Sequence, residues 1–103
     1  TATLFNDEME AKAFSSASLF EIPLHSLKGN FGHTLGAAGI LESIFTYRSL
    51  QEKIILPSDN FEELGVSEPV NVNTTLIATN KNHALKTASG FGGCNAALIY
   101  SLT

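Results

Sequence analysis

Near the start of the chain, apolar residues recur at the spacing of one helix face. Either Asn6 or Asp7 can cap such a helix, because a short polar side chain accepts a hydrogen bond from the first free backbone N–H groups. Glu10 stands three positions after Asp7, like the far half of a capping box. We therefore expect a helix from this cap to about Leu19, with apolar positions at Met9, Ala13, Phe14 and Ala17.

A second helical pattern begins at Thr34 or Gly36 and continues to about Gln51. Its first turns consist almost entirely of Gly, Ala and Leu, and such small residues allow another backbone to approach closely. We therefore expect a buried, close-packed helix. Between the two helices, residues 22–27 are typical of a short strand, and residues 29–32 are typical of a Gly-containing loop.

The C-terminal part of the chain predicts strands. Residues 53–66 are expected to be mostly loop, because Pro, Gly, Asp and Asn interrupt any periodic pattern. Residues 84–89 and 96–102 have the composition of strands, and the Gly-rich segment 90–93 between them predicts a hairpin. The order of these elements predicts an α/β fold in which a mixed sheet packs against helices.

The composition is unusual for a small independent domain. Of the 103 residues, 44% are hydrophobic and only 16% are charged, whereas a charged fraction of about 25% is average. A small domain has a large surface to cover with polar groups, so we expect part of this surface to be buried against another polypeptide. The chain also starts at Thr1 without Met or a basic signal segment, which is typical of a piece of a longer protein.

Charge and cysteine content argue against several classes of function. The net charge is -4 and no basic stripe is present, so we expect no nucleic-acid partner. The longest apolar runs fall well short of the roughly 18 residues that a membrane span needs, so we expect no membrane partner. Cys94 is the single Cys, which excludes an internal disulfide and suits a cytoplasmic location.

His33 is the strongest candidate for chemistry. It lies between a Gly-containing loop and the second predicted helix, where the positive end of the helix dipole favours a neutral imidazole. Such an imidazole can donate a hydrogen bond to a developing oxyanion or accept a proton; a His that only holds the loop in place is an equal alternative. Lys28, expected at the end of a strand, can hold an ionised partner such as Glu42, and a solvated loop Lys is its ordinary alternative.

The turn from Gly90 to Gly93 supplies backbone N–H groups with little side-chain crowding. Such a turn can form half of an oxyanion hole, with Phe91 as an aromatic wall beside it, or it can be an ordinary hairpin turn. We interpret Cys94 as a small core residue rather than a nucleophile. The spacing of His25, His33, His83 and Cys94 matches no recognised zinc pattern, so no metal is expected.

Three segments together resemble the C-terminal half of a β-ketoacyl-acyl carrier protein synthase of the discrete fatty-acid-synthesis type. Residues 1–10, with Thr1 and Thr3, are similar to the family's His-Gly-Thr-x-Thr loop and the helix after it. Residues 28–39 with Glu42, and residues 90–95, are similar to its other two motifs. Thr34 follows Gly-His where the degradative thiolases usually place Pro.

The resemblance implies a thiolase-like fold, of which residues 1–103 form the C-terminal half. It implies a decarboxylative Claisen condensation of malonyl-carrier protein with an acyl thioester in fatty-acid biosynthesis. His33 corresponds to the His that hydrogen-bonds the malonyl thioester carbonyl, and Lys28 to the Lys that supports this loop through Glu42. The Phe91 N–H corresponds to an oxyanion-hole donor, and its ring to the gate of the acyl pocket. Implied binding residues are Thr1, Thr3, Gly90 and Phe91; implied supporting residues are Glu42, Asp7, Glu10 and Asn95.

The resemblance also implies partners. The acyl carrier protein brings phosphopantetheine with its substrate, so no resident cofactor is expected, and the full enzyme is expected to be a homodimer. The nucleophilic Cys and a second His belong to the family's N-terminal half and to the residues before Thr1, so we expect the isolated chain to be inactive. The alternatives are a fragment of a non-catalytic relative of the chain-length-factor type, a specialised polyene or polyketide synthase, and a stand-alone interaction module.

Overall fold

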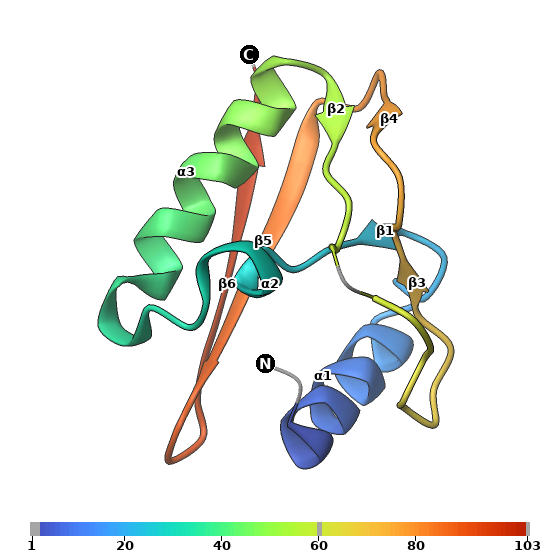
Figure 1. Ribbon diagram of the computed structural model, residues 1–103, viewed down its shortest axis with the longest axis vertical. Coiled ribbons are helices and arrows are strands. Elements are labelled where there is room, and N and C mark those ends of the chain that lie inside the picture. Colours follow the sequence, from blue (N-terminus) through green and yellow to red (C-terminus); the bar gives the residue numbers. More distant parts are fainter. Residues whose placement is uncertain (1–2, 60, 103) are drawn as a thin grey trace. The chain divides into compact units, whose positions relative to one another are not determined.

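The computed structural model describes residues 3–59 and 61–102 and divides the chain into two compact units (Figure 1). Unit 1 comprises Thr1–His33 and Leu56–Leu76, and unit 2 comprises Thr34–Ile55 and Ile77–Thr103. Each unit combines helix and strand, in agreement with the α/β class. In the described residues the strands form three separate two-stranded sheets, which corrects the expectation of one mixed sheet.

Unit 1 begins with α1, Leu4–Ser16, which starts earlier than the sequence indicates. Thr3 is the N-cap residue, and its carbonyl accepts a hydrogen bond from the Asp7 N–H at 3.0 Å. The predicted cap at Asn6 or Asp7 is therefore wrong, because both residues already lie inside the helix. The Asn6 side chain instead donates to Glu10 one turn later, at 3.2 Å.

The end of α1 is a Schellman-type stop rather than a continuation to Leu19. Ser18 has a positive φ of 59°, and the Leu19 N–H donates back to the Phe14 carbonyl at 2.8 Å. This left-handed residue satisfies the last free carbonyls of the helix and reverses the chain. The helix therefore stops at Ser16.

A short parallel strand pair follows in unit 1. The strand predicted over residues 22–27 shortens to β1, Pro23–Leu24, which pairs with β3, Asn71–Val72. Asn73 continues the pairing, because its N–H donates to the Leu24 carbonyl at 2.7 Å. Its buried side-chain amide donates to the carbonyls of Leu56 and Thr75 at 2.9 and 2.7 Å. Asn73 therefore joins three separate backbone segments.

The expected loop over residues 29–32 is a short helix instead. This helix, α2, spans Lys28–Phe31, so Lys28 opens a helical turn and does not end a strand. The Ser26 hydroxyl accepts a hydrogen bond from the Lys28 N–H at 3.3 Å, which satisfies one of the free donors at the start of the turn. Gly32 ends it with a φ of 77° and a ψ of 178°.

Unit 2 begins with the second predicted helix. A 3-10 turn, η1, spans Leu35–Ala37, and α3 spans Ala38–Gln51. The end of α3 agrees with the sequence prediction. After a turn at Lys53, which has a φ of 58°, β2 spans Ile54–Ile55 and pairs with β4, Ile77–Ala78.

The predicted hairpin is confirmed. Its strands are β5, His83–Gly90, and β6, Cys94–Ser101, which pair antiparallel with Gly90 opposite Cys94 and Lys86 opposite Leu98. The helix α3 packs against β5 and β2, and Figure 1 shows it running beside the hairpin. The hairpin and α3 thus form the frame of unit 2.

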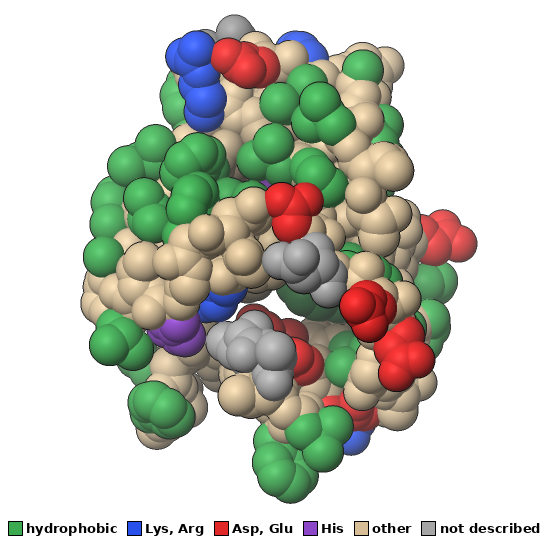
Figure 2. All heavy atoms as spheres, in the orientation of Figure 1, with side chains coloured by type: hydrophobic (Ala, Val, Ile, Leu, Met, Phe, Trp, Pro, Cys, Tyr) green, Lys and Arg blue, Asp and Glu red, His purple; other side chains and the backbone are tan. Residues whose placement is uncertain are grey.

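The apolar surface of α3 is largely uncovered. Leu50 and Thr46 are buried, but Ile40 and Ile44 are 65% and 58% exposed, and Figure 2 shows hydrophobic side chains gathered over this helix. A Cβ added at Gly39 would meet no atom within 4 Å. The expectation of a buried, close-packed helix is therefore wrong within this chain. Among residues 3–59 and 61–102, none of the helices has both the length and the apolar character to cross a bilayer.

Candidate functional site

His33 is an exposed side chain that follows Gly32 directly. The Gly32 backbone, at φ 77° and ψ 178°, lies in a region that is essentially restricted to Gly. This conformation turns the chain sharply between α2 and the imidazole. Along the chain, α3 begins later than predicted, because η1 intervenes and the N-cap residue of α3 is Ala37. His33 therefore does not directly precede the first turn of α3 in the sequence.

The segment that carries Lys28 and His33 is tied to residues 58 and 59 of the same unit. The Ser26 N–H donates to the Ser58 hydroxyl at 2.9 Å, and the Asn30 side chain donates to Asp59 at 2.6 Å. Within the turn, the Gly32 N–H donates to the Lys28 carbonyl at 2.8 Å. The half-buried Lys28 and the exposed His33 thus belong to one anchored turn.

Glu42 lies in the second turn of α3 and forms an ion pair with Lys86 of β5, at 3.0 Å between Nζ and Oε1. The two side chains are only 13% and 16% exposed. Sequence reasoning missed Lys86 because it named only Lys28 as the cation for Glu42. The signal that could have found it is a Lys within an otherwise uncharged strand, at a position where one face packs on a helix.

The hairpin turn brings together the candidates of the third motif. Gly92 and Gly93 have φ angles of 82° and 78°, and Phe91 between the strands is fully exposed. The pairing of Ser89 with Asn95 places Asn95 at the base of this turn. Cys94 is exposed, so its interpretation as a core residue is wrong. The reason is that β6 has little covering it in this chain, although its sequence is apolar.

The first motif is described in part. Thr3 is exposed at the N-cap of α1, Asp7 and Glu10 are half-buried in that helix, and Thr1 lies outside the described residues. Glu8, a residue of the same helix that sequence analysis did not single out, connects α1 to Ser67. Its carboxylate accepts hydrogen bonds from the Ser67 hydroxyl and, at 2.9 Å, from the Ser67 N–H. These two donors hold the pKa of the Glu8 carboxyl below its ordinary value.

The predicted residues fall into two groups. Unit 1 carries Thr3, Asp7, Glu10, Lys28 and His33, whereas unit 2 carries Glu42, Gly90, Phe91 and Asn95. Each group is described within its own unit. In residues 3–59 and 61–102, no group of three His, Cys, Asp or Glu side chains is placed to hold a metal ion.

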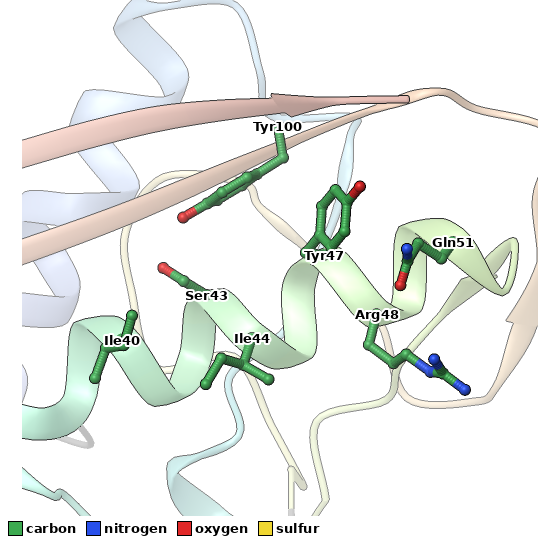
Figure 3. A pocket seen from close by; sticks show the side chains of 7 residues that line it. All are labelled: Ile40, Ser43, Ile44, Tyr47, Arg48, Gln51 and Tyr100. Atoms are coloured by element: carbon green, nitrogen blue, oxygen red, sulfur yellow. The ribbon is translucent and has the colours of Figure 1, made fainter. Parts of the chain in front are cut away.

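A shallow groove of about 350 Å³ runs along α3 beside β6 (Figure 3). It is mostly apolar, and the rings of Tyr47 and Tyr100 lie on its hairpin side with centroids 6.3 Å apart. Ile40 and Ile44 line it along the helix, and Arg48 and Gln51 lie toward its end. Sequence analysis did not name these residues as a group.

Comparisons with known proteins identify relatives. Residues 1–62 match the model of the β-ketoacyl synthase C-terminal domain. A 3-oxoacyl-[acyl-carrier-protein] synthase homolog of Saccharomyces cerevisiae is 37% identical over 97% of this chain, and a 3-oxoacyl-[acyl-carrier-protein] synthase 1 of Haemophilus influenzae is 39% identical over 97%. A highly reducing polyketide synthase of Alternaria alternata is 34% identical over 96%.

The chain spans about a quarter of the first two relatives, 26% and 25% of their lengths, and 4% of the polyketide synthase. The family model covers α1, α2, η1 and α3, and the two synthase alignments extend over nearly the whole chain. By these matches, the chain belongs to the family of β-ketoacyl synthase C-terminal domains.

Proposed function

We propose that residues 1–103 form the C-terminal domain of a 3-oxoacyl-acyl carrier protein synthase. The proposed reaction is the decarboxylative condensation of malonyl-carrier protein with an acyl thioester in fatty-acid biosynthesis, an acyl transfer. The observation that carries this proposal is an exposed imidazole, His33, on an anchored turn, in a chain of this family. A ring open to a substrate is what the reaction requires, and a ring enclosed in a dry core would not serve it.

The exposed apolar surface supports a thiolase-like sandwich as the finer fold. Leu98 and Ile99 are neighbours in β6, so they point to opposite faces of the hairpin. They are 57% and 71% exposed. A sheet with apolar residues on both faces is stable when a layer covers each side. We propose that the rest of the synthase, which carries the nucleophilic Cys and a second His, packs over the exposed faces of the hairpin and over the apolar side of α3.

In the proposed mechanism, the malonyl thioester binds with its carbonyl oxygen beside His33. Loss of CO₂ leaves an enolate, and the imidazole N–H stabilises the charge that develops on this oxygen. The carbanion then attacks the acyl thioester on the enzyme's Cys, and the Cys thiolate leaves with formation of the 3-oxoacyl product. The tetrahedral oxyanion formed in that attack accepts a hydrogen bond from the Phe91 N–H.

The remaining residues have supporting roles in this proposal. Thr1 and Thr3 bind the phosphopantetheine arm that arrives on the acyl carrier protein, so the enzyme needs no resident cofactor. Lys28 and Glu42 are supporting residues for the His33 turn, while Gly90 and the Phe91 ring border the acyl pocket. Asp7, Glu10 and Asn95 support the helix and the hairpin turn that carry these groups. The complete enzyme is proposed to be a cytoplasmic homodimer.

The test is the decarboxylation of malonyl-carrier protein by the full-length synthase and its His33→Ala variant. Removal of one preorganised oxyanion donor typically lowers kcat by about 10²- to 10³-fold, and we expect a loss of that size. His83→Ala is the matched control, because His83 is also an exposed His, at the start of β5. Equal rates for wild type and His33→Ala would contradict the proposal. The isolated chain is expected to show no turnover with acyl- and malonyl-carrier proteins.

A polyketide synthase is the second candidate, favoured by the match to the Alternaria alternata protein. Both candidates use the same condensation, so they differ in product. Mass spectrometry of the condensation products from different acyl substrates separates them: extension of saturated acyl thioesters alone indicates fatty-acid synthesis, and extension of polyene or 3-oxoacyl thioesters indicates the alternative. A full-length protein without a nucleophilic Cys and without condensation would indicate a non-catalytic relative of the chain-length-factor type.

A further inference from the structure

The ion pair between Lys86 and Glu42 is withdrawn from solvent. The Lys86 Nζ lies 3.0 Å from the Glu42 Oε1, the side chains are 13% and 16% exposed, and Nζ also donates to the Thr87 carbonyl. Charge-assisted hydrogen bonds away from water are stronger and more directional than exposed ones. Loss of one partner removes the opposite charge that offsets the cost of desolvating the other. The pair therefore fixes one point of β5 against one point of α3.

The same helix carries an exposed pair for comparison. Arg48 and Glu52 lie 2.9 Å apart, with side chains 69% and 51% exposed, at positions i and i+4. Such exposed ion pairs contribute little to the free energy of folding. An apolar contact would suffice to pack α3 on β5 at the Lys86 position. A charge pair at this position costs free energy, because both charged groups lose contact with water. What it contributes specifically is a defined position of β5 relative to α3.

Lys86 lies four residues before Gly90, where β5 enters the hairpin turn. Beyond that point the turn has little packing of its own. Phe91 is fully exposed, and a Cβ added at Gly92 or Gly93 would meet no atom within 4 Å. The position of the turn relative to α3 thus depends on where β5 is held upstream.

We propose that Lys86 is a positioning residue for condensation, which holds the Phe91 N–H in place by anchoring β5 to Glu42 of α3. This inference rests on the proposed function, because it assigns the Phe91 N–H to the acyl oxyanion. Lys86 acts through the strand and does not touch the substrate. A displacement of about 1 Å at such a donor is enough to lower a rate about 10²-fold.

The experiment compares Lys86→Met, Lys86→Arg and the control Glu52→Gln in the full-length synthase. Acyl transfer to the enzyme from acyl-carrier protein, malonyl decarboxylation and KM are measured separately. We expect Lys86→Met to lower kcat of acyl transfer about 10- to 100-fold with KM unchanged, and Lys86→Arg to restore it to within about threefold. Decarboxylation, which depends on His33, is expected to fall less than acyl transfer.

Backbone amide exchange at residues 91–93 provides a second readout that does not require turnover. We expect faster exchange in Lys86→Met, and wild-type exchange in Lys86→Arg and Glu52→Gln. Wild-type kcat in Lys86→Met, failure of Lys86→Arg to restore it, or an equal loss in Glu52→Gln would overturn the proposal. If Lys86→Met is insoluble, Lys86→Gln replaces it. An inactive wild-type enzyme would refute the proposed function, whereas the exchange rates would still decide the anchoring role.

Discussion

Replacing Gly32 with Ala tests whether the backbone before His33 sets the position of the imidazole. Gly32 has a φ of 77° and a ψ of 178°. For a residue with a Cβ, this region costs about 1–3 kcal/mol. A Cβ at this position would meet no atom within 4 Å, so the cost is one of backbone conformation and not of steric overlap with neighbours.

The strained Ala can relax by changing its φ and ψ, which swings His33 away from its native position. A cost of about 1–3 kcal/mol corresponds to a decrease of about 5- to 150-fold in the fraction of molecules with the native turn. We therefore expect malonyl decarboxylation by the full-length Gly32→Ala synthase to fall within that range. The thermal midpoint is expected to fall as well, because residues 28–32 form one hydrogen-bonded turn.

The matched control is Gly36→Ala. Gly36 lies in η1, its φ is not in the left-handed region, and the space around it is also open. It adds the same methyl group four residues away without backbone strain, so we expect a rate close to wild type. Wild-type decarboxylation in Gly32→Ala, or equal losses in both variants, would refute the reasoning.

Two further predictions concern unit 1. Because the pKa of Glu8 is depressed in the folded state, its bonds to Ser67 stabilise the fold at pH values above its ordinary pKa of 4.5, and this stabilisation is lost as the pH falls through the lower pKa of the folded state. The difference in thermal midpoint between wild type and Glu8→Gln should therefore be constant from pH 6 to 7.5 and shrink below about pH 4.5. A difference that stays constant down to pH 3 would contradict this prediction. Asn73→Ala removes the buried side-chain amide that donates to the carbonyls of Leu56 and Thr75. Leu56 is half-buried and Thr75 is exposed, so we expect the free energy of unfolding to fall by about 0.5–1.5 kcal/mol per hydrogen bond lost. Urea unfolding measures this loss, with the exposed Asn95→Ala as control; equal midpoints would contradict the prediction.

The hairpin and α3 were predictable because their signals are local. A Gly-rich turn between two apolar runs is sufficient to predict β5 and β6, and the helical spacing after Gly36 is sufficient to predict α3 to Gln51. The turn at Lys28 was not predictable in this way, because Gly29 and Asn30 have low helix propensity. Hydrogen bonds donated by the Ser26 N–H to Ser58 and by the Asn30 side chain to Asp59, far along the chain, hold that segment in place.

Errors at the site have a similar origin. Lys86 and Glu42 are distant in sequence, so their pairing depends on how α3 packs against β5. A Lys in an otherwise uncharged strand marks one partner of an ion pair, but the sequence does not identify the other partner. Cys94 was placed in a core because β6 is apolar, but strand composition does not say which layer covers the strand. His33, Lys28, Glu42 and the turn with Phe91 were singled out by their residue types and spacing, and the resemblance between sequences added the roles of the first motif. All of these proposed roles remain predictions for the experiments above.

The exposed Cys94 at the base of the turn has a practical consequence. It is the single Cys of the 103 residues, and it pairs directly with Gly90 next to Phe91. A maleimide fluorophore attached to this sulfur would report on its immediate surroundings, including the movement of the neighbouring ring. Under the proposed function, titration of the labelled chain with an arm mimic such as pantetheine is expected to change this fluorescence.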